Sequence, residues 1–143
     1  MAPNLTLSKS IIIKTTKAKV WEALTNPELI KKYFFGTECI TDWKKGSPIL
    51  YKGTWDGQAY EDKGNIIDIE KEKFILYNFW SSFSGTEDIP ENYAQIRYDL
   101  DEKNSETVLK VIQGGFQTKE LLETSEKNWS YTLEELKKML EEK

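Results

Sequence analysis

The sequence predicts an α+β domain in which a curved antiparallel sheet wraps around a long C-terminal helix, with two short helices after the first strand. Three observations support this prediction. An apolar N-terminal strand is followed by a short helical pair, a series of hairpins occupies the middle of the chain, and an amphipathic segment ends it. With 143 residues and no repeat or linker, the chain is expected to be one domain, 1–143, large enough for a full core.

The helical pair is predicted from apolar spacing and from capping residues. Residues 5–14 contain three consecutive isoleucines and predict the strand that precedes the pair. In the first helix, expected at 17–24, one face carries Val20, Trp21 and Leu24. Asn26 can cap a second helix that begins at Pro27, where the missing N–H costs nothing, and Gly36 ends the pair. The apolar residues of the second helix are Leu29, Ile30, Tyr33 and Phe34.

Consecutive hairpins between residues 37 and 113 predict an antiparallel sheet. Asp56-Gly57 is a strong turn signal, and Gly64 is expected to mark a bulge or bend. Residues 82–92 are expected to be a longer loop, and Gly114-Gly115 is expected to close the sheet. The expected strands are 37–42, 49–55, 58–70, 74–81, 93–100 and 107–113.

The last segment, about 117–142, predicts a long helix that buries one stripe against the sheet. Thr124-Ser125 is expected to kink or recap it. A strongly curved sheet around a helix leaves a space between them, floored by the helical pair, which is the expected ligand site. The stripe consists of Leu122, Trp129, Leu133, Leu136 and Leu140.

Composition narrows the classes of function. A net charge of −4 argues against a nucleic-acid binder, although residues 1–32 hold six lysines against two glutamates. No apolar run approaches the roughly 20 residues of a membrane span, and the first residues lack a signal-peptide core. The one cysteine, Cys39, excludes an intramolecular disulfide, so a cytoplasmic location is expected.

Several motifs resemble the SRPBCC / START-like helix-grip superfamily. The stretch 20–28, Val-Trp-Glu-Ala-Leu-Thr-Asn-Pro-Glu, carries most of the resemblance, followed by Tyr33-Phe34. Weaker matches are Gly46, 64–69, 107–111 leading into 114–116, Trp129 and 133–137. More closely, the chain resembles the branch called activator of heat-shock-protein-90 ATPase homologue, C-terminal-domain-like. The resemblance covers nearly the whole chain and implies a helix-grip fold.

The chain has no histidine, and Gln113 stands where many relatives carry one. The commonest general base near neutral pH is therefore missing, and with it the imidazole ligand of a zinc site. A Ser-His-Asp or Cys-His arrangement is impossible, so an enzyme would need carboxylates, tyrosine or lysine. No catalytic residue, metal or cofactor is predicted.

The resemblance favours the Tyr98 side of strand 93–100 as the inward face. Arg97 then lies outside, paired with a neighbouring acid, whereas a one-residue slip would make it a buried anion clamp. The same reasoning turns Leu76, Asn78 and Trp80 inward on one neighbouring strand and Leu109, Val111 and Gln113 on the other. The expected cavity-lining residues are Trp21, Tyr33, Phe34, Tyr51, Asn78, Trp80, Tyr98, Gln113 and Trp129, and whether they line a cavity or fill it stays open.

Three functions remain for such a domain. The first is binding of a small hydrophobic or aromatic ligand in the internal cavity. The second is a protein-interaction module of the chaperone ATPase-activator type, active in stress response, for which the lysines of residues 1–32 are the first surface to consider. The third is a polyketide-cyclase- or hydrolase-like enzyme. The sequence leaves the oligomeric state open, although an exposed edge strand could pair two chains.

Overall fold

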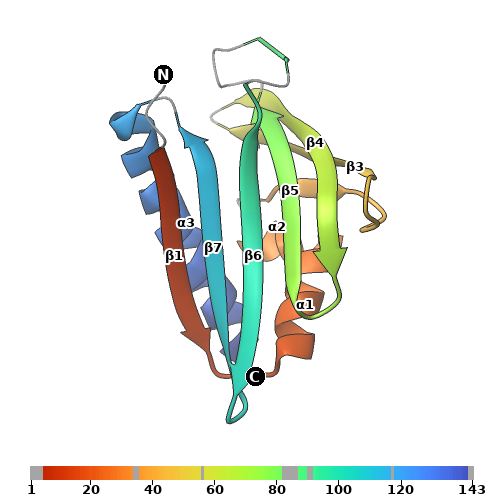
Figure 1. Cartoon of the computed structure of the whole chain (residues 1–143), viewed down its shortest axis with the longest axis vertical. Helices are drawn as coiled ribbons and strands as arrows, with labels where there is room; N and C mark the ends of the chain where they lie inside the picture. Colours follow the sequence, from red (N-terminus) through yellow and green to blue (C-terminus); the bar gives the residue numbers. More distant parts are fainter. Residues whose placement is uncertain are drawn as a thin grey trace.

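Seven antiparallel strands form one sheet in the computed structural model, which describes residues 5–33, 36–55, 57–81, 87–89, 92–116 and 118–141 (Figure 1). The described strands are β1 (Leu5–Ile13), β2 (Glu38–Ile40), β3 (Pro48–Trp55), β4 (Gln58–Glu70), β5 (Phe74–Ser81), β6 (Ala94–Lys103) and β7 (Glu106–Phe116). The described helices are α1 (Lys17–Thr25), α2 (Pro27–Tyr33) and α3 (Lys119–Glu141).

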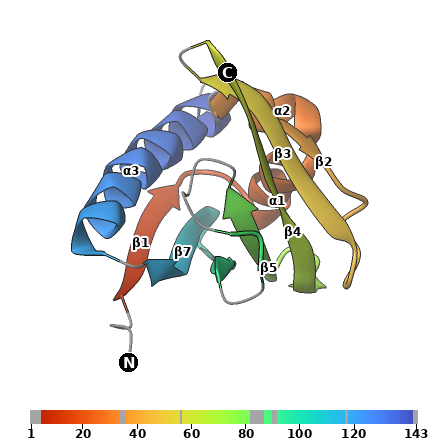
Figure 2. The same ribbon diagram turned by 90° about the horizontal axis from the view of Figure 1, so that it is seen from above.

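The order of strands across the sheet is β1-β7-β6-β5-β4-β3-β2. The sheet is strongly curved, and all three helices lie on its concave side (Figure 2). This arrangement confirms the predicted α+β helix-grip fold. None of the described helices combines the length and the apolarity that a membrane-spanning helix requires.

Local capping shapes the helical pair as predicted. Asn26 separates α1 from α2, and its side-chain oxygen accepts a hydrogen bond from the backbone N–H of Glu28 at 3.0 Å. Pro27 is the first residue of α2. The hydroxyl of Tyr33 donates to the carbonyl oxygen of Ala23 at 2.8 Å, and this buried bond fixes α2 against α1.

Two predictions about the ends of elements are wrong. Gly114 and Gly115 do not close the sheet but lie inside β7, which continues to Phe116 and pairs with β1 up to that residue. The expected kink or new cap at Thr124-Ser125 does not divide the helix either, since α3 runs uninterrupted through these residues. The hydroxyl of Thr124 is satisfied within the helix, because it donates to the carbonyl of Glu120 at 3.1 Å.

The predicted irregularity of β4 lies beyond Gly64. The register with β5 shifts between Ile66 and Asp68, and this shift allows both Ile66 and Ile69 to face the core. Gly64 has a different role, since a Cβ there would lie 1.8 Å from the backbone carbonyl oxygen of Asn78. A glycine at this position therefore permits the close approach of β4 and β5.

The C-terminal half of α3 holds the helix against the sheet. Trp129, Leu133 and Leu136 are buried, and the helix packs mainly over β1. Near its end, the Lys137 ammonium donates to the carbonyl oxygen of Ile12 at 2.7 Å and pairs with Glu141 at 2.8 Å. These contacts also cover part of the free edge of β1.

Candidate functional site

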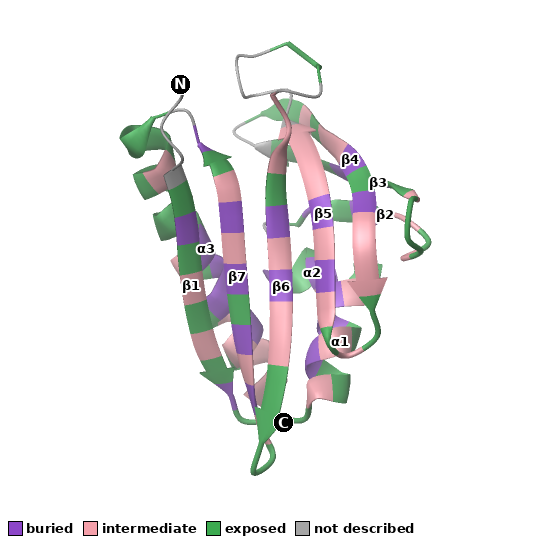
Figure 3. Cartoon of the chain, viewed as in Figure 1, coloured by how far each residue is buried: buried purple, intermediate pink, exposed green. Residues whose placement is uncertain are grey.

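A row of polar side chains on five of the seven strands crosses the inner face of the sheet. It consists of Gln113 on β7, Tyr98 on β6, Tyr77 on β5, Tyr51 on β3 and Cys39 on β2, and we call it the polar row. All five residues are buried, with exposed fractions of 2% to 8%. The buried positions of the central strands lie side by side in Figure 3.

Neighbouring members of the polar row contact each other. The ring centroids of Tyr51 and Tyr77 are 6.0 Å apart, and those of Tyr77 and Tyr98 are 6.1 Å apart. The hydroxyl of Tyr77 interacts with those of both other tyrosines, and the hydroxyl of Tyr51 interacts with the Cys39 thiol. The three phenols and the thiol therefore form one continuous polar cluster inside the protein.

Helix α3 completes the row through Trp129. Its indole N–H donates to the side-chain oxygen of Gln113 at 2.7 Å. Its ring stands edge-on to Tyr98, with centroids 5.9 Å apart and an interplanar angle of 81°. One buried side chain of the helix is thus tied to two strands, so the position of α3 over the sheet depends on the polar row.

Burial keeps the polar row uncharged. Removal from water raises the pKa of Tyr51, Tyr77 and Tyr98 well above the usual value, and it raises the pKa of the Cys39 thiol to about 11. In the described part of the chain, the buried polar side chains outside the tyrosines are three threonines and Gln113, none of them charged. On the inner face of β4, Asp62 lies opposite Tyr51 and has one buried carboxylate oxygen, so the inner face is neutral along the polar row but not throughout.

The structure brings five of the nine predicted site residues together: Tyr33, Tyr51, Tyr98 and Trp129 are buried in one core, and the buried Gln113 accepts a hydrogen bond from Trp129. Trp21 is only partly buried and packs at the margin of that core. Phe34 lies outside the described residues. Within the described ranges, no cluster of three or more metal-ligating side chains is present.

The predicted inward positions of Asn78 and Trp80 are wrong. Strand pairing sets Tyr98 opposite Ile75, and both residues are buried, so the inward face of β5 carries Ile75 and Tyr77. Asn78 and Trp80 alternate with these residues and lie on the outer face. The pattern was ambiguous because large apolar side chains occupy both faces of β5.

Arg97 lies on the outer face, as predicted. Its Nε is 2.9 Å from a carboxylate oxygen of Asp99, two residues along the same face of β6. Its guanidinium also stacks over the ring of Phe74, 4.5 Å from the centroid. The alternative in which Arg97 is a buried anion clamp is therefore wrong.

Tyr77 and Cys39 belong to the row but were not predicted to be part of the site. The inward position of Tyr77 could have been predicted from Asn78. As the lone amide among apolar neighbours on β5, Asn78 favours solvent, and the alternation of the strand then turns Tyr77 inward. Cys39 lies in a three-residue strand, and its neighbours Glu38 and Ile40 are both exposed. So short a segment gives too few alternations for its sequence to indicate a face.

The bond between Trp129 and Gln113 can be tested by a double-mutant cycle. Trp129→Phe is expected to lower the free energy of unfolding by about 1–3 kcal/mol, because the buried oxygen of Gln113 loses its indole donor. Adding Gln113→Leu should then cost much less than it costs alone, giving a coupling of about 1 kcal/mol in urea unfolding. Strictly additive costs would show that this hydrogen bond contributes nothing.

Comparisons with known proteins agree with the helix-grip fold described above. The family model for Activator of Hsp90 ATPase homolog 1-like protein matches residues 14–141. A search of the curated proteins gave no match. The solution structure of ChR145 from Cytophaga hutchinsonii is 40% identical, with a TM-score of 0.85 over 99% of this chain and 97% of that chain.

Two more distant structures share the fold. The Aha1 dimer from Colwellia psychrerythraea is 18% identical, with a TM-score of 0.77 and coverage of 96% of both chains. CalU16 from Micromonospora echinospora is 17% identical, with a TM-score of 0.77 over 96% of this chain and 75% of that chain. Since the family model matches nearly the whole sequence, this chain belongs to the Activator of Hsp90 ATPase homolog 1-like protein family.

Proposed function

We propose that this domain binds a small, uncharged, flat and largely apolar molecule between the sheet and the helices, beside the polar row. The observation that carries the proposal is the set of neutral hydrogen-bonding groups in an otherwise apolar interior. Ligand sites combine these two properties, since apolar walls supply affinity and a few polar groups fix orientation.

The composition of the core supports a role beyond folding. Aliphatic side chains fill a core without burying polar atoms, whereas each buried phenol or amide must be supplied with a partner. Tyr51, Tyr77 and Tyr98 meet this requirement through polar contacts with one another. A ligand hydroxyl or carbonyl can exchange for one of these links at little cost, because one neutral hydrogen bond replaces another.

The same row indicates which ligands are excluded. A carboxylate placed beside Tyr98 would lose its water and meet no cation among the buried described residues. The proposed ligand is therefore neutral rather than anionic at physiological pH. Aromatic ligands fit best, because Tyr77, Tyr98 and Trp129 offer ring edges and faces for stacking.

A thermal-shift screen with uncharged lipids, flavonoids and aromatic metabolites tests this proposal, since a ligand that binds the folded state raises the melting temperature. For a compound that does so, Tyr98→Phe and Gln113→Leu are each expected to weaken binding about tenfold by calorimetry, the loss of one useful hydrogen bond. Tyr131→Phe is the matched control, because Tyr131 is 53% exposed on α3. Absence of stabilisation by every compound would contradict the proposal.

The family supports a second candidate, a protein-interaction module that stimulates a chaperone ATPase. The surface to test is the lysine-rich N-terminal part, where Lys31 and Lys32 are exposed at the end of α2. This candidate is tested by adding the domain to Hsp90 and measuring ATP hydrolysis. Stimulation that is lost in Lys31→Glu/Lys32→Glu and kept in Tyr98→Phe would favour the interaction role, and no stimulation by the intact chain would exclude it.

A further inference from the structure

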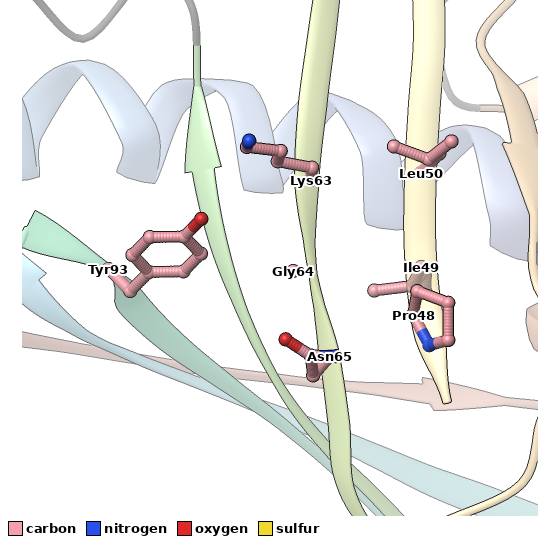
Figure 4. A pocket seen from close by; sticks show the side chains of 7 residues that line it. All are labelled: Pro48, Ile49, Leu50, Lys63, Gly64, Asn65 and Tyr93. Atoms are coloured by element: carbon pink, nitrogen blue, oxygen red, sulfur yellow. The ribbon is translucent and has the colours of Figure 1, made fainter. Parts of the chain in front are cut away.

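A groove lies on the outer face of the sheet, on the side away from α3. It has a volume of about 300 Å³, and its lining includes Pro48 and Leu50 of β3, Lys63 and Asn65 of β4, and Tyr93 just before β6. These side chains alternate with buried inward positions such as Ile49 and Ile66, which places them outside. In Figure 4, Lys63 and Asn65 extend toward Tyr93, with Leu50 and Pro48 beside them on β3. We call it the outer groove.

Two hydrogen-bond donors of the outer groove converge on a carboxylate of the chain itself. One oxygen of Asp88 forms an ion pair with the ammonium of Lys63, and the other accepts a hydrogen bond from the hydroxyl of Tyr93 at 2.5 Å. Lys63 also lies over the ring of Trp80, 5.9 Å from the centroid, which helps to hold its side chain in place. Lys63 and Tyr93 are thus arranged to bind the two oxygens of one carboxylate.

The groove beside this pair has both an apolar and a polar part. Pro48 is exposed and Leu50 is partly exposed, so they provide an apolar surface open to a ligand. Lys63 is the one charged side chain among the described lining residues, and its partner Asp88 balances its charge at the rim of the groove. Displacement of Asp88 would therefore leave Lys63 as a cation for a ligand carboxylate.

We propose that the outer groove is a second binding site, for a small molecule that carries a carboxylate on an aromatic or apolar body. The ligand carboxylate takes the place of Asp88 at Lys63 and Tyr93, and its body lies along Pro48 and Leu50. Asp88 is the internal competitor for this site, since it holds the same two donors when no ligand is present. The proposal is independent of the proposed interior site, since the two sites share no residue.

Phenylacetate and its neutral amide, phenylacetamide, are suitable probes in a titration of the ¹⁵N-labelled chain by NMR. Phenylacetate is expected to shift the amide signals of residues 49–50 and 63–65, with an affinity at least ten times that of phenylacetamide, because only the carboxylate pairs with Lys63. Equal binding of the two probes, or shifts confined to the inward residues of β5 and β6, would overturn the proposal.

Two variants sharpen the test because their effects have opposite signs. Lys63→Gln is expected to abolish the preference for phenylacetate, whereas Asp88→Asn is expected to tighten phenylacetate binding several-fold by removing the internal competitor. Lys52→Gln is the matched control, since Lys52 is an exposed lysine of β3 paired with Glu61 at 3.9 Å and does not line the groove. Unchanged or weaker binding in Asp88→Asn would refute the role given to Asp88.

Discussion

Above about pH 10 the protein is expected to lose stability steeply, because four buried tyrosines resist ionisation in the folded state. Burial raises the pKa of Tyr33, Tyr51, Tyr77 and Tyr98, whereas phenols in the unfolded chain ionise near pH 10. Their stabilisation is therefore complete below about pH 10 and is lost as the pH rises toward the folded-state values. Each phenol then removes about 1.4 kcal/mol of the free energy of unfolding per pH unit.

Four such groups together remove on the order of 5 kcal/mol per pH unit, a large part of the total stability of an ordinary domain. Urea unfolding at a series of alkaline pH values, with phenolate absorbance recorded in parallel, measures this loss. Tyr98→Phe should reduce the loss of unfolding free energy per pH unit by about one phenol's share. Ionisation of all the tyrosines while the chain stays folded would contradict the buried row.

Gly64→Ala is expected to destabilise the fold by about 3 kcal/mol or more, the upper end of the cost of overpacking. The new methyl group would lie 1.8 Å from the carbonyl oxygen of Asn78 and 2.6 Å from the carbonyl carbon. Both atoms belong to the backbone of β5, so the two strands must move apart, which also weakens the bond from the Asn65 N–H to the Asn78 side chain. Chemical denaturation measures the change.

Gly114→Ala, on β7 of the same sheet, is the matched control. Its added Cβ would meet nothing closer than the Thr6 hydroxyl at 3.7 Å, and its φ is not positive. We therefore expect a change within about 0.5 kcal/mol, or a slight gain from the reduced freedom of the unfolded chain. A large loss at Gly114, or a negligible loss at Gly64, would show that close approach of β4 and β5 is not the reason for the glycine.

The helical pair and the hairpins were predictable because their signals are local. Asn26 and Pro27 specify a cap and a first turn whatever the rest of the chain does. Asn104 and Ser105 both adopt positive φ in the turn between β6 and β7, close to the predicted connection. The ends of β7 and the continuity of α3 depended instead on packing, since pairing with β1 extends β7 through its two glycines.

The site was predictable only in part, because the register of each strand decides which of its residues face inward. On β6 the resemblance indicated the inward face, and Tyr98 lies there. On β5 no sequence signal outweighed the apolar residues of both faces, so Tyr77 was assigned outside and Trp80 inside. The outer position of Trp80 has a physical reason, since Lys63 covers its ring.

The most direct test of the central claim compares two ligands of similar shape, one neutral and one carboxylate, against the interior of the intact chain. The indole signal of Trp129 and the hydroxyl signals of the buried tyrosines should respond in NMR to a neutral aromatic compound that raises the melting temperature, and they should not respond to its carboxylate analogue. In Tyr98→Phe the response should weaken about tenfold. Binding of the carboxylate at Trp129 with equal affinity, or a response unchanged in Tyr98→Phe, would contradict a neutral ligand site at the polar row.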